Sequence, residues 1–252
     1  MTSTYRIASD VCFSTDQDGT IILDVRGGKF HSLIQSGSNL WSILAAHRNG
    51  ITLVELVDHV TKQDGELRHE PRERVESAVE HILHQLTANK LLETDRSRRS
   101  ILQQLKCRLC VAGAIVIRQA GNALIRLRGV HTAAFIEFAF YEVIRRFGGF
   151  QARNAIIRQW PIASTRWRHA PAGLTDLCDA VHTAAVWYPK QTLCLQKASV
   201  TTSLLRQHGF RAEMKIGVRK QPFHAHAWVE VDGEVVGDHQ NVRKYFRQIA
   251  SW

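Results

Sequence analysis

The run AHAWVEVDGEVVGD, residues 225–238, restricts the fold more than any other part of the sequence. Residues 225–231 alternate in polarity as a half-buried strand does, and Asp232-Gly233 is a typical hairpin turn. Residues 234–238 then return as a second strand. The chain must therefore contain an antiparallel hairpin whose two faces carry different side chains.

The length of the hairpin loop decides which side chains meet. A two-residue loop would place Ala227 opposite Asp238 and turn His226 to the other face. A three-residue loop would instead pair Glu230 with Glu234, and His226 would then lie opposite Asp238. We expect the three-residue register, or a bulge that restores it, because only that parity lets the imidazole face the carboxylate.

A second informative stretch is TLCLQKASVTTSLLRQHGF, residues 192–210, which we predict to be a helix beginning near Cys194. Thr192 can cap its first turn, and Gly209 is expected to end it in the left-handed conformation. A cysteine in the first turn lies near unpaired N–H groups and the positive end of the helix dipole, and both favour the thiolate. The alternative is an inert cysteine, because cysteine is often buried.

Together these stretches supply the parts of a cysteine nucleophile with its base. His226 follows Cys194 by 32 positions, and Asp238 follows His226 by 12. A thiol, an imidazole and a carboxylate can deprotonate the nucleophile, orient the base and protonate a leaving amine. The backbone N–H of Cys194 would provide one oxyanion donor, and Gln191 or Gln240 is a candidate for the second.

A zinc site is the competing interpretation of the same region. His224 and His226 share a strand face, and Asp238 is followed by His239, so imidazole and carboxylate ligands are available. We prefer the triad, because zinc would leave Cys194 unexplained unless it were the fourth ligand. No metal and no cofactor are therefore expected.

Two longer stretches of the sequence are more specific than the spacing of Cys194, His226 and Asp238. CLQKASVTTSLLRQHGF and RAEMKIGVRKQPFHAHAWVEVDGEVVGD resemble the B protein of lasso peptide biosynthesis, a transglutaminase-like leader peptidase, over residues 175–245. The resemblance implies a papain- or transglutaminase-like α+β domain, which we place at residues 111–252. It also implies that Cys194, His226 and Asp238 form the catalytic triad.

The N-terminal part, residues 1–95, has the outline of a small winged-helix-like domain. The predicted strands are residues 11–14, 20–25 and 29–34, the predicted helices are 38–47, 52–61 and 71–88, and Leu91-Leu92 begins a last short strand. Winged helices commonly bind DNA, but residues 1–95 carry 9 Lys/Arg and 14 Asp/Glu. This net negative charge opposes contact with phosphates.

The pattern GGKFHSLIQSGSNLWSILA, followed by GITLVELVDHV and VESAVEHILHQLTANKLLE, instead resembles the PqqD-like recognition element of RiPP biosynthesis. That resemblance implies that a precursor's leader peptide adds as a strand beside the third strand and packs on the third helix. The implied groove residues are Phe30, His31, Ser32, Leu33, Ile34, Val75, Ala78, Val79 and Ile82. Ordinary core packing is the alternative for each of them.

The remaining sequence connects the two domains and limits the class of protein. Residues 96–110 are predicted to be a linker, in which Cys107 and Cys110 form a lone C-x-x-C that we interpret as structural. Helices are predicted over residues 131–147 and 174–187, and the basic, tryptophan-rich segment 148–173 has no assigned role. Five cysteines without a secretory signal indicate the cytoplasm.

The positive charge of the C-terminal part does not by itself identify a binding partner. Residues 96–252 carry 24 Lys/Arg and 9 Asp/Glu, but the arginines are scattered and no nucleic-acid motif is present. The longest apolar runs are too short to span a bilayer. We therefore expect no nucleic acid and no membrane insertion.

The sequence thus predicts a leader peptidase of lasso peptide maturation, with the precursor peptide as substrate. The resemblance further implies a separate ATP-dependent, asparagine-synthetase-like cyclase as a partner. Two other functions remain open: transglutaminase or amide transfer, which shares the thioester intermediate, and a non-catalytic chaperone that only binds the peptide.

Overall fold

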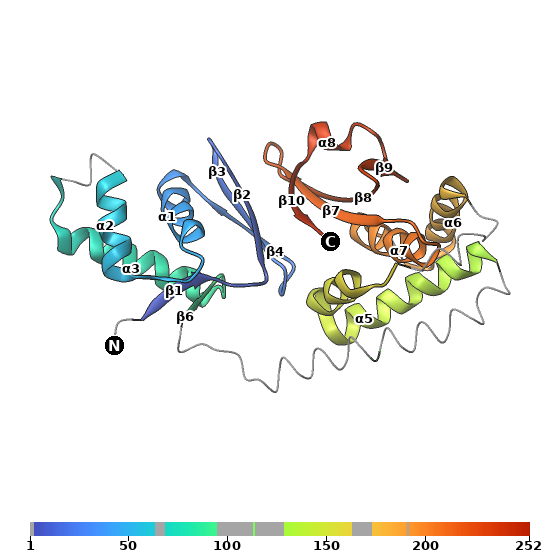
Figure 1. Ribbon diagram of the computed structural model, residues 1–252, viewed down its shortest axis with the longest axis horizontal. Coiled ribbons are helices and arrows are strands. Elements are labelled where there is room, and N and C mark those ends of the chain that lie inside the picture. Colours follow the sequence, from blue (N-terminus) through green and yellow to red (C-terminus); the bar gives the residue numbers. More distant parts are fainter. Residues whose placement is uncertain (1–2, 64–68, 95–112, 114–128, 163–172, 191) are drawn as a thin grey trace. The chain divides into compact units, whose positions relative to one another are not determined.

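The computed structural model describes residues 3–63, 69–94, 113, 129–162, 173–190 and 192–252. The chain divides into two compact units, Met1–Gln104 and Leu105–Trp252 (Figure 1). The proposed linker at 96–110, with Cys107 and Cys110, lies outside the described residues. The mixture of helices and sheets confirms the predicted α+β class.

Three predicted strands form an antiparallel sheet in the first unit, in the order β2-β3-β4. They are β2 (Val11–Asp16), β3 (Gly19–Asp24) and β4 (Lys29–Leu33). The central strand β3 is buried along its whole length. β4 is an edge strand, and among the described residues it pairs only with β3.

A second small sheet, in the order β5-β1-β6, joins distant parts of the same unit. It consists of β5 (Ile51–Thr52), β1 (Thr4–Ile7) and β6 (Leu92–Thr94). β6 is the predicted last strand, whereas β1 was not predicted. These strands are two to four residues long, so pairing rather than a local hydrophobic pattern defines them.

The three predicted helices of the first unit are α1 (Gln35–Ala46), α2 (Leu53–Gln63) and α3 (Arg72–Ala88). They share one core with the sheets, and Trp41, Leu56 and Leu83 are among its most buried side chains. Apolar residues at helical spacing on each helix supply this core, as the sequence pattern predicted.

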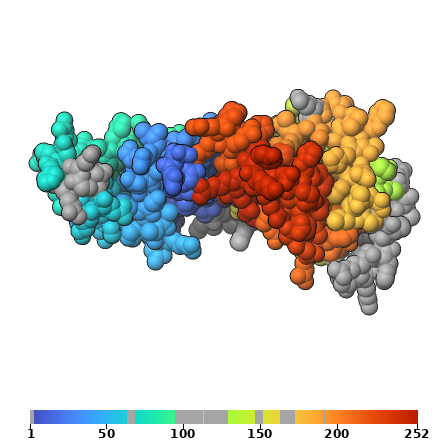
Figure 2. All heavy atoms as spheres, turned by 90° about the horizontal axis from the view of Figure 1, so that it is seen from above, coloured from blue at the N-terminus to red at the C-terminus, as the bar shows by residue number. Residues whose placement is uncertain are grey.

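The second unit contains a four-stranded antiparallel sheet in the order β10-β7-β8-β9. Its strands are β7 (Ala212–Arg219), β8 (His224–Val231), β9 (Glu234–Val236) and β10 (Arg247–Ser251), with the short helix α8 (Val242–Tyr245) between the last two. The helix α7 (Cys194–Gln207) packs against β7 and β8 (Figure 1). Figure 2 shows the C-terminal segment, in red, on the visible face.

Two further helices, α5 (Val130–Gln159) and α6 (Leu174–Trp187), pack against α7 and against each other. α6 has the predicted limits. α5 is longer than the predicted helix at residues 131–147, because it continues through Gly148-Gly149 as far as Gln159. Among the described residues, no helix is both long and apolar enough to cross a membrane.

Candidate active site

Cys194 is the first residue of α7, and this position determines its surroundings. The N-cap is Leu193, whose apolar side chain makes no capping hydrogen bond. The prediction that Thr192 is the N-cap was therefore wrong by one position. The N–H groups of Cys194 and Leu195 have no intrahelical acceptors, so they remain available to the sulfur or to a substrate oxygen, whereas the Gln196 N–H donates to the Leu193 carbonyl at 3.0 Å.

The hairpin between β8 and β9 has a two-residue loop, and the predicted three-residue register was wrong. Val231 pairs with Glu234, and Val229 pairs with Val236. Asp232 and Gly233 both have positive φ, 49° and 88°. This is the backbone of a type I′ turn, whose twist matches that of the strands it joins.

His226 and Asp238 nevertheless meet: Nε2 of the imidazole lies 2.6 Å from Oδ2 of the carboxylate. The contact does not belong to the ladder, because β9 ends at Val236. Gly237 follows in the left-handed conformation, with φ 66°, and turns the chain so that Asp238 points back to β8. The turn, and not a bulge, brings the two side chains together.

Asp238 is fixed by contacts on both of its sides. The backbone N–H of His239 donates to its Oδ1 at 2.7 Å. On α6, Nε2 of His182 lies 2.9 Å from the Gly237 carbonyl oxygen, to which it donates. The carboxylate is therefore held in one orientation against the imidazole.

The electrostatics of the site favour a thiolate–imidazolium pair. Burial of the thiol opposes its ionisation, but the hydrogen bond with His226 and one from the backbone of Ala227 outweigh it, so the pKa of Cys194 is lowered. The hydrogen bonds to Asp238 and to Cys194 raise the pKa of His226 to about 9. By contrast, burial raises the pKa of Cys178 to about 11.

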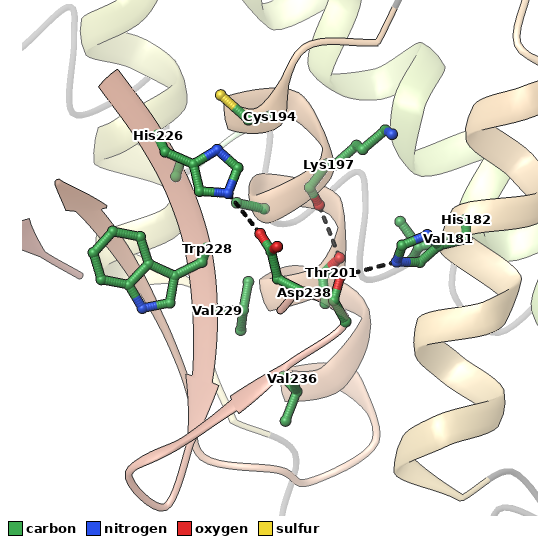
Figure 3. A pocket seen from close by; sticks show the side chains of 13 residues that line it. Val181, His182, Cys194, Lys197, Thr201, His226, Trp228, Val229, Val236 and Asp238 are labelled. Atoms are coloured by element: carbon green, nitrogen blue, oxygen red, sulfur yellow. Dashed lines mark hydrogen bonds and ion pairs between the residues drawn. The ribbon is translucent and has the colours of Figure 1, made fainter. Parts of the chain in front are cut away.

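Around these groups lies a pocket of about 230 Å³ (Figure 3). Cys194, Lys197 and Thr201 line it from one face of α7, and His226 and Val229 line it from β8. Figure 3 shows the imidazole between the Cys194 and Asp238 side chains. A peptide bond in this pocket would be within reach of the nucleophile and of its base.

Of the two candidates for a second oxyanion donor, the structure describes only Gln240. Gln191 lies outside the described residues. Gln240 donates its side-chain amide to the Val235 carbonyl at 2.8 Å, and it is not among the described residues that line the pocket. Backbone hydrogen bonds from Leu195 and Ala227 help to lower the pKa of Cys194, so N–H groups do face the sulfur.

The histidines proposed as alternative zinc ligands have other neighbours. The ring of His224 lies 5.8 Å from that of Phe246, and His239 contacts Asp238 through its backbone N–H. Within the described ranges, no group of three or more His, Cys, Asp or Glu side chains could hold a metal ion.

The predicted peptide-binding residues are divided between an edge strand and a core. Residues 30–33 belong to β4, and Ile34 follows it with 77% of its surface exposed. On α3, Val75 and Val79 are buried in the core of the first unit, Ala78 is exposed, and Ile82 is partly buried. Val75 and Val79 thus have the packing role that the sequence left open as an alternative.

Three residues at this site were missed in the sequence: His182, Lys197 and Glu142. Lys197 has a local signal, because three positions after Cys194 on a helix means the same face. His182 lies on α6 and Glu142 on α5, far from the motif in sequence. Only tertiary packing brings them to the pocket and to the start of α7.

Comparison with known proteins adds three similarities. Residues 137–251 match the Transglutaminase-like superfamily. Over 57 residues the chain is 40% identical to the Microcin J25-processing protein McjB of Escherichia coli. The aligned segment is 23% of this chain and 27% of that protein. The chain therefore spans about a quarter of the length of this curated relative.

Among solved structures, TbiB1 in complex with the TbiA(beta) leader peptide matches with 25% identity and a TM-score of 0.31. The match covers 35% of this chain and 94% of that one.

Proposed function

The chain resembles the B proteins of lasso peptide biosynthesis, as its sequence predicted, and from this premise we propose that it is the leader peptidase of that maturation. One observation supports the proposal above the others. His226 bonds Asp238 through Nε2 at 2.6 Å, and its hydrogen bond to Cys194 lowers the pKa of the thiol. The triad is therefore poised for nucleophilic attack.

Substrate capture begins on the first unit in this proposal. The leader of the precursor peptide adds as a strand beside β4, the edge strand of its sheet, where main-chain hydrogen bonds hold it. Ile34, Ala78 and Ile82 offer apolar surface to its side chains. Tethering raises the local concentration of the scissile bond at the second unit without requiring new contacts there.

Cleavage then follows in two steps. The Cys194 thiolate attacks the carbonyl carbon, and the N–H groups of Cys194 and Leu195, at the start of α7, stabilise the oxyanion. His226, as imidazolium, gives its proton to the departing amine as the C–N bond breaks, which leaves a thioester. Water then adds to the thioester with His226 as base, the leader leaves as a carboxylate, and the thiolate is restored.

The amine that leaves is the new N-terminus of the core peptide. We propose that an ATP-dependent, asparagine-synthetase-like cyclase consumes it, because joining an amine to a side-chain carboxyl requires activation of that carboxyl.

Asp238 keeps the imidazole of His226 oriented throughout the cleavage cycle and is not itself protonated.

The test is to incubate the purified chain with a candidate precursor peptide and to weigh the products. Hydrolysis gives a free leader carboxylate and a shortened core. With an amine in excess, a leader amide as the main product would indicate transglutaminase activity instead. Leader binding without any cleavage would leave a peptide-binding chaperone.

A further inference from the structure

The start of α7 is held by an acidic side chain from another helix. Glu142 of α5 is only 9% exposed. Its Oε1 lies 2.7 Å from Nζ of Lys190, and its Oε2 accepts from Nε2 of Gln196 at 3.2 Å. Lys190 precedes Cys194 by four positions and Gln196 follows it by two, so one carboxylate contacts the chain on both sides of the nucleophile.

The contact continues to the backbone at the helix start. Oε1 of Gln196 accepts from the N–H of Leu193 at 3.4 Å, and Leu193 is the N-cap residue. Glu142, Gln196 and Leu193 therefore form a chain of hydrogen bonds that ends next to Cys194. Arg145 also binds Glu142, through two hydrogen bonds of 2.8 and 3.0 Å, but these bonds do not involve the turn at Cys194.

The usual way to stabilise a helix start would interfere with the proposed chemistry. A Ser, Thr or Asp at the N-cap accepts from the N–H groups of the first turn and contributes about 1 kcal/mol. One of these groups, the Leu195 N–H, hydrogen-bonds to the sulfur of Cys194, and an oxyanion would need N–H groups of the same turn. Leu193 occupies the N-cap without a side-chain acceptor, so no cap competes with the sulfur for the Leu195 N–H.

We propose that Glu142 is a positioning residue, which replaces the missing cap by holding the Cys194 turn from outside through Lys190 and Gln196. This inference rests on the proposed role of Cys194 as nucleophile. The contacts to Arg145, first, and to Lys190 lower the pKa of Glu142 to about 2, so the carboxylate is charged across the working range.

The direction in which the reactivity of Cys194 changes when Glu142 is removed distinguishes a positioning role from a simple charge effect. A nearby anion, by its field alone, disfavours the thiolate, so removal of Glu142 would make Cys194 more reactive. A positioning role requires the opposite. Without Glu142 the turn shifts, the hydrogen bonds from His226 and the Leu195 backbone weaken, and the pKa of Cys194 rises.

The test measures alkylation of Cys194 by iodoacetamide from pH 5 to 10 in the full-length chain, with the labelled peptide quantified by mass. Because alkylation needs no peptidase substrate, its outcome is separable from failure of the proposed function. Glu142→Ala should slow alkylation at pH 7 about tenfold, which corresponds to about one pKa unit. Arg145→Gln, the matched control, should react as the wild type does.

Two further variants keep the proposal falsifiable. If Glu142→Ala does not fold, as judged by circular dichroism, then Glu142→Gln decides, because its amide can accept from Gln196 but loses the ion pair with Lys190. We expect an intermediate loss that is not additive with Gln196→Ala. Unchanged or faster alkylation in folded Glu142 variants, or equal slowing in Arg145→Gln, would overturn the inference.

Discussion

Nε2 of His226 and Oδ2 of Asp238 are 2.6 Å apart, although the strands that carry the two residues do not pair them. The carboxylate reaches the imidazole because the chain leaves β9 at Val236 and turns at Gly237. The geometry of the proposed triad therefore depends on a single left-handed residue and on the contacts that hold it.

Gly237→Ala should impair both stability and activity. Its φ of 66° strains any other residue by about 1–2 kcal/mol, and a Cβ would meet Sγ of Cys178 at 3.3 Å. We expect a lower urea midpoint and a kcat reduced at least about tenfold, as Asp238 is displaced.

Gly233→Ala is the matched control for this variant. Gly233 has φ 88°, but a Cβ there would meet nothing within 4 Å. It should lose similar stability through strain and keep its kcat. Equal kcat values for the two variants would contradict the role assigned to Gly237.

Asp238→Asn should change the alkaline side of the pH profile. The pKa of His226 is raised to about 9, first by Asp238, so the imidazolium that protonates the leaving amine is lost as pH rises through about 9. Without the carboxylate this pKa falls, the loss of activity moves to lower pH, and kcat drops about 100-fold. Cleavage rates from pH 5 to 10 provide the measurement; an unmoved alkaline limb would exclude the pairing as the cause.

Cys194→Ala should abolish cleavage and leave leader binding intact, because capture and chemistry are assigned to different units. Fluorescence anisotropy of a labelled leader measures binding, and the mass of the products measures cleavage. Cys178→Ala is the control: burial raises the pKa of that thiol to about 11, and its loss should leave cleavage unchanged. Loss of binding together with cleavage would argue against the division of labour.

Ile34→Asp should weaken leader binding about tenfold without lowering the thermal midpoint. Ile34 is 77% exposed at the end of the edge strand β4, so its replacement costs little in the free protein. Burying such a side chain under a bound peptide is worth about 1.5–3 kcal/mol. Val54→Asp, on α2 and 48% exposed, should bind normally; equal weakening in both variants would point to a non-specific charge effect.

Local sequence patterns were sufficient for most of the fold. Apolar residues at helical spacing predicted α1, α2 and α3, and short runs bounded by the turn signals Asp18-Gly19 and Gly27-Gly28 predicted β2, β3 and β4. Gly209 ends α7 as expected, with φ 85° and a hydrogen bond from the Phe210 N–H to the Leu205 carbonyl. The passage of α5 through Gly148-Gly149 was missed, because helix packing can override the low propensity of glycine.

For the site, the sequence by itself determined which groups are available: a cysteine at a helix start, a histidine on a strand, and an aspartate after a hairpin. It did not determine how they meet, since the predicted register was wrong and the contact was made by Gly237 instead. His182 and Glu142 were also beyond its reach. Both act through tertiary contacts, and such contacts leave no periodic signal in the chain, because they join residues that are about 50 positions apart.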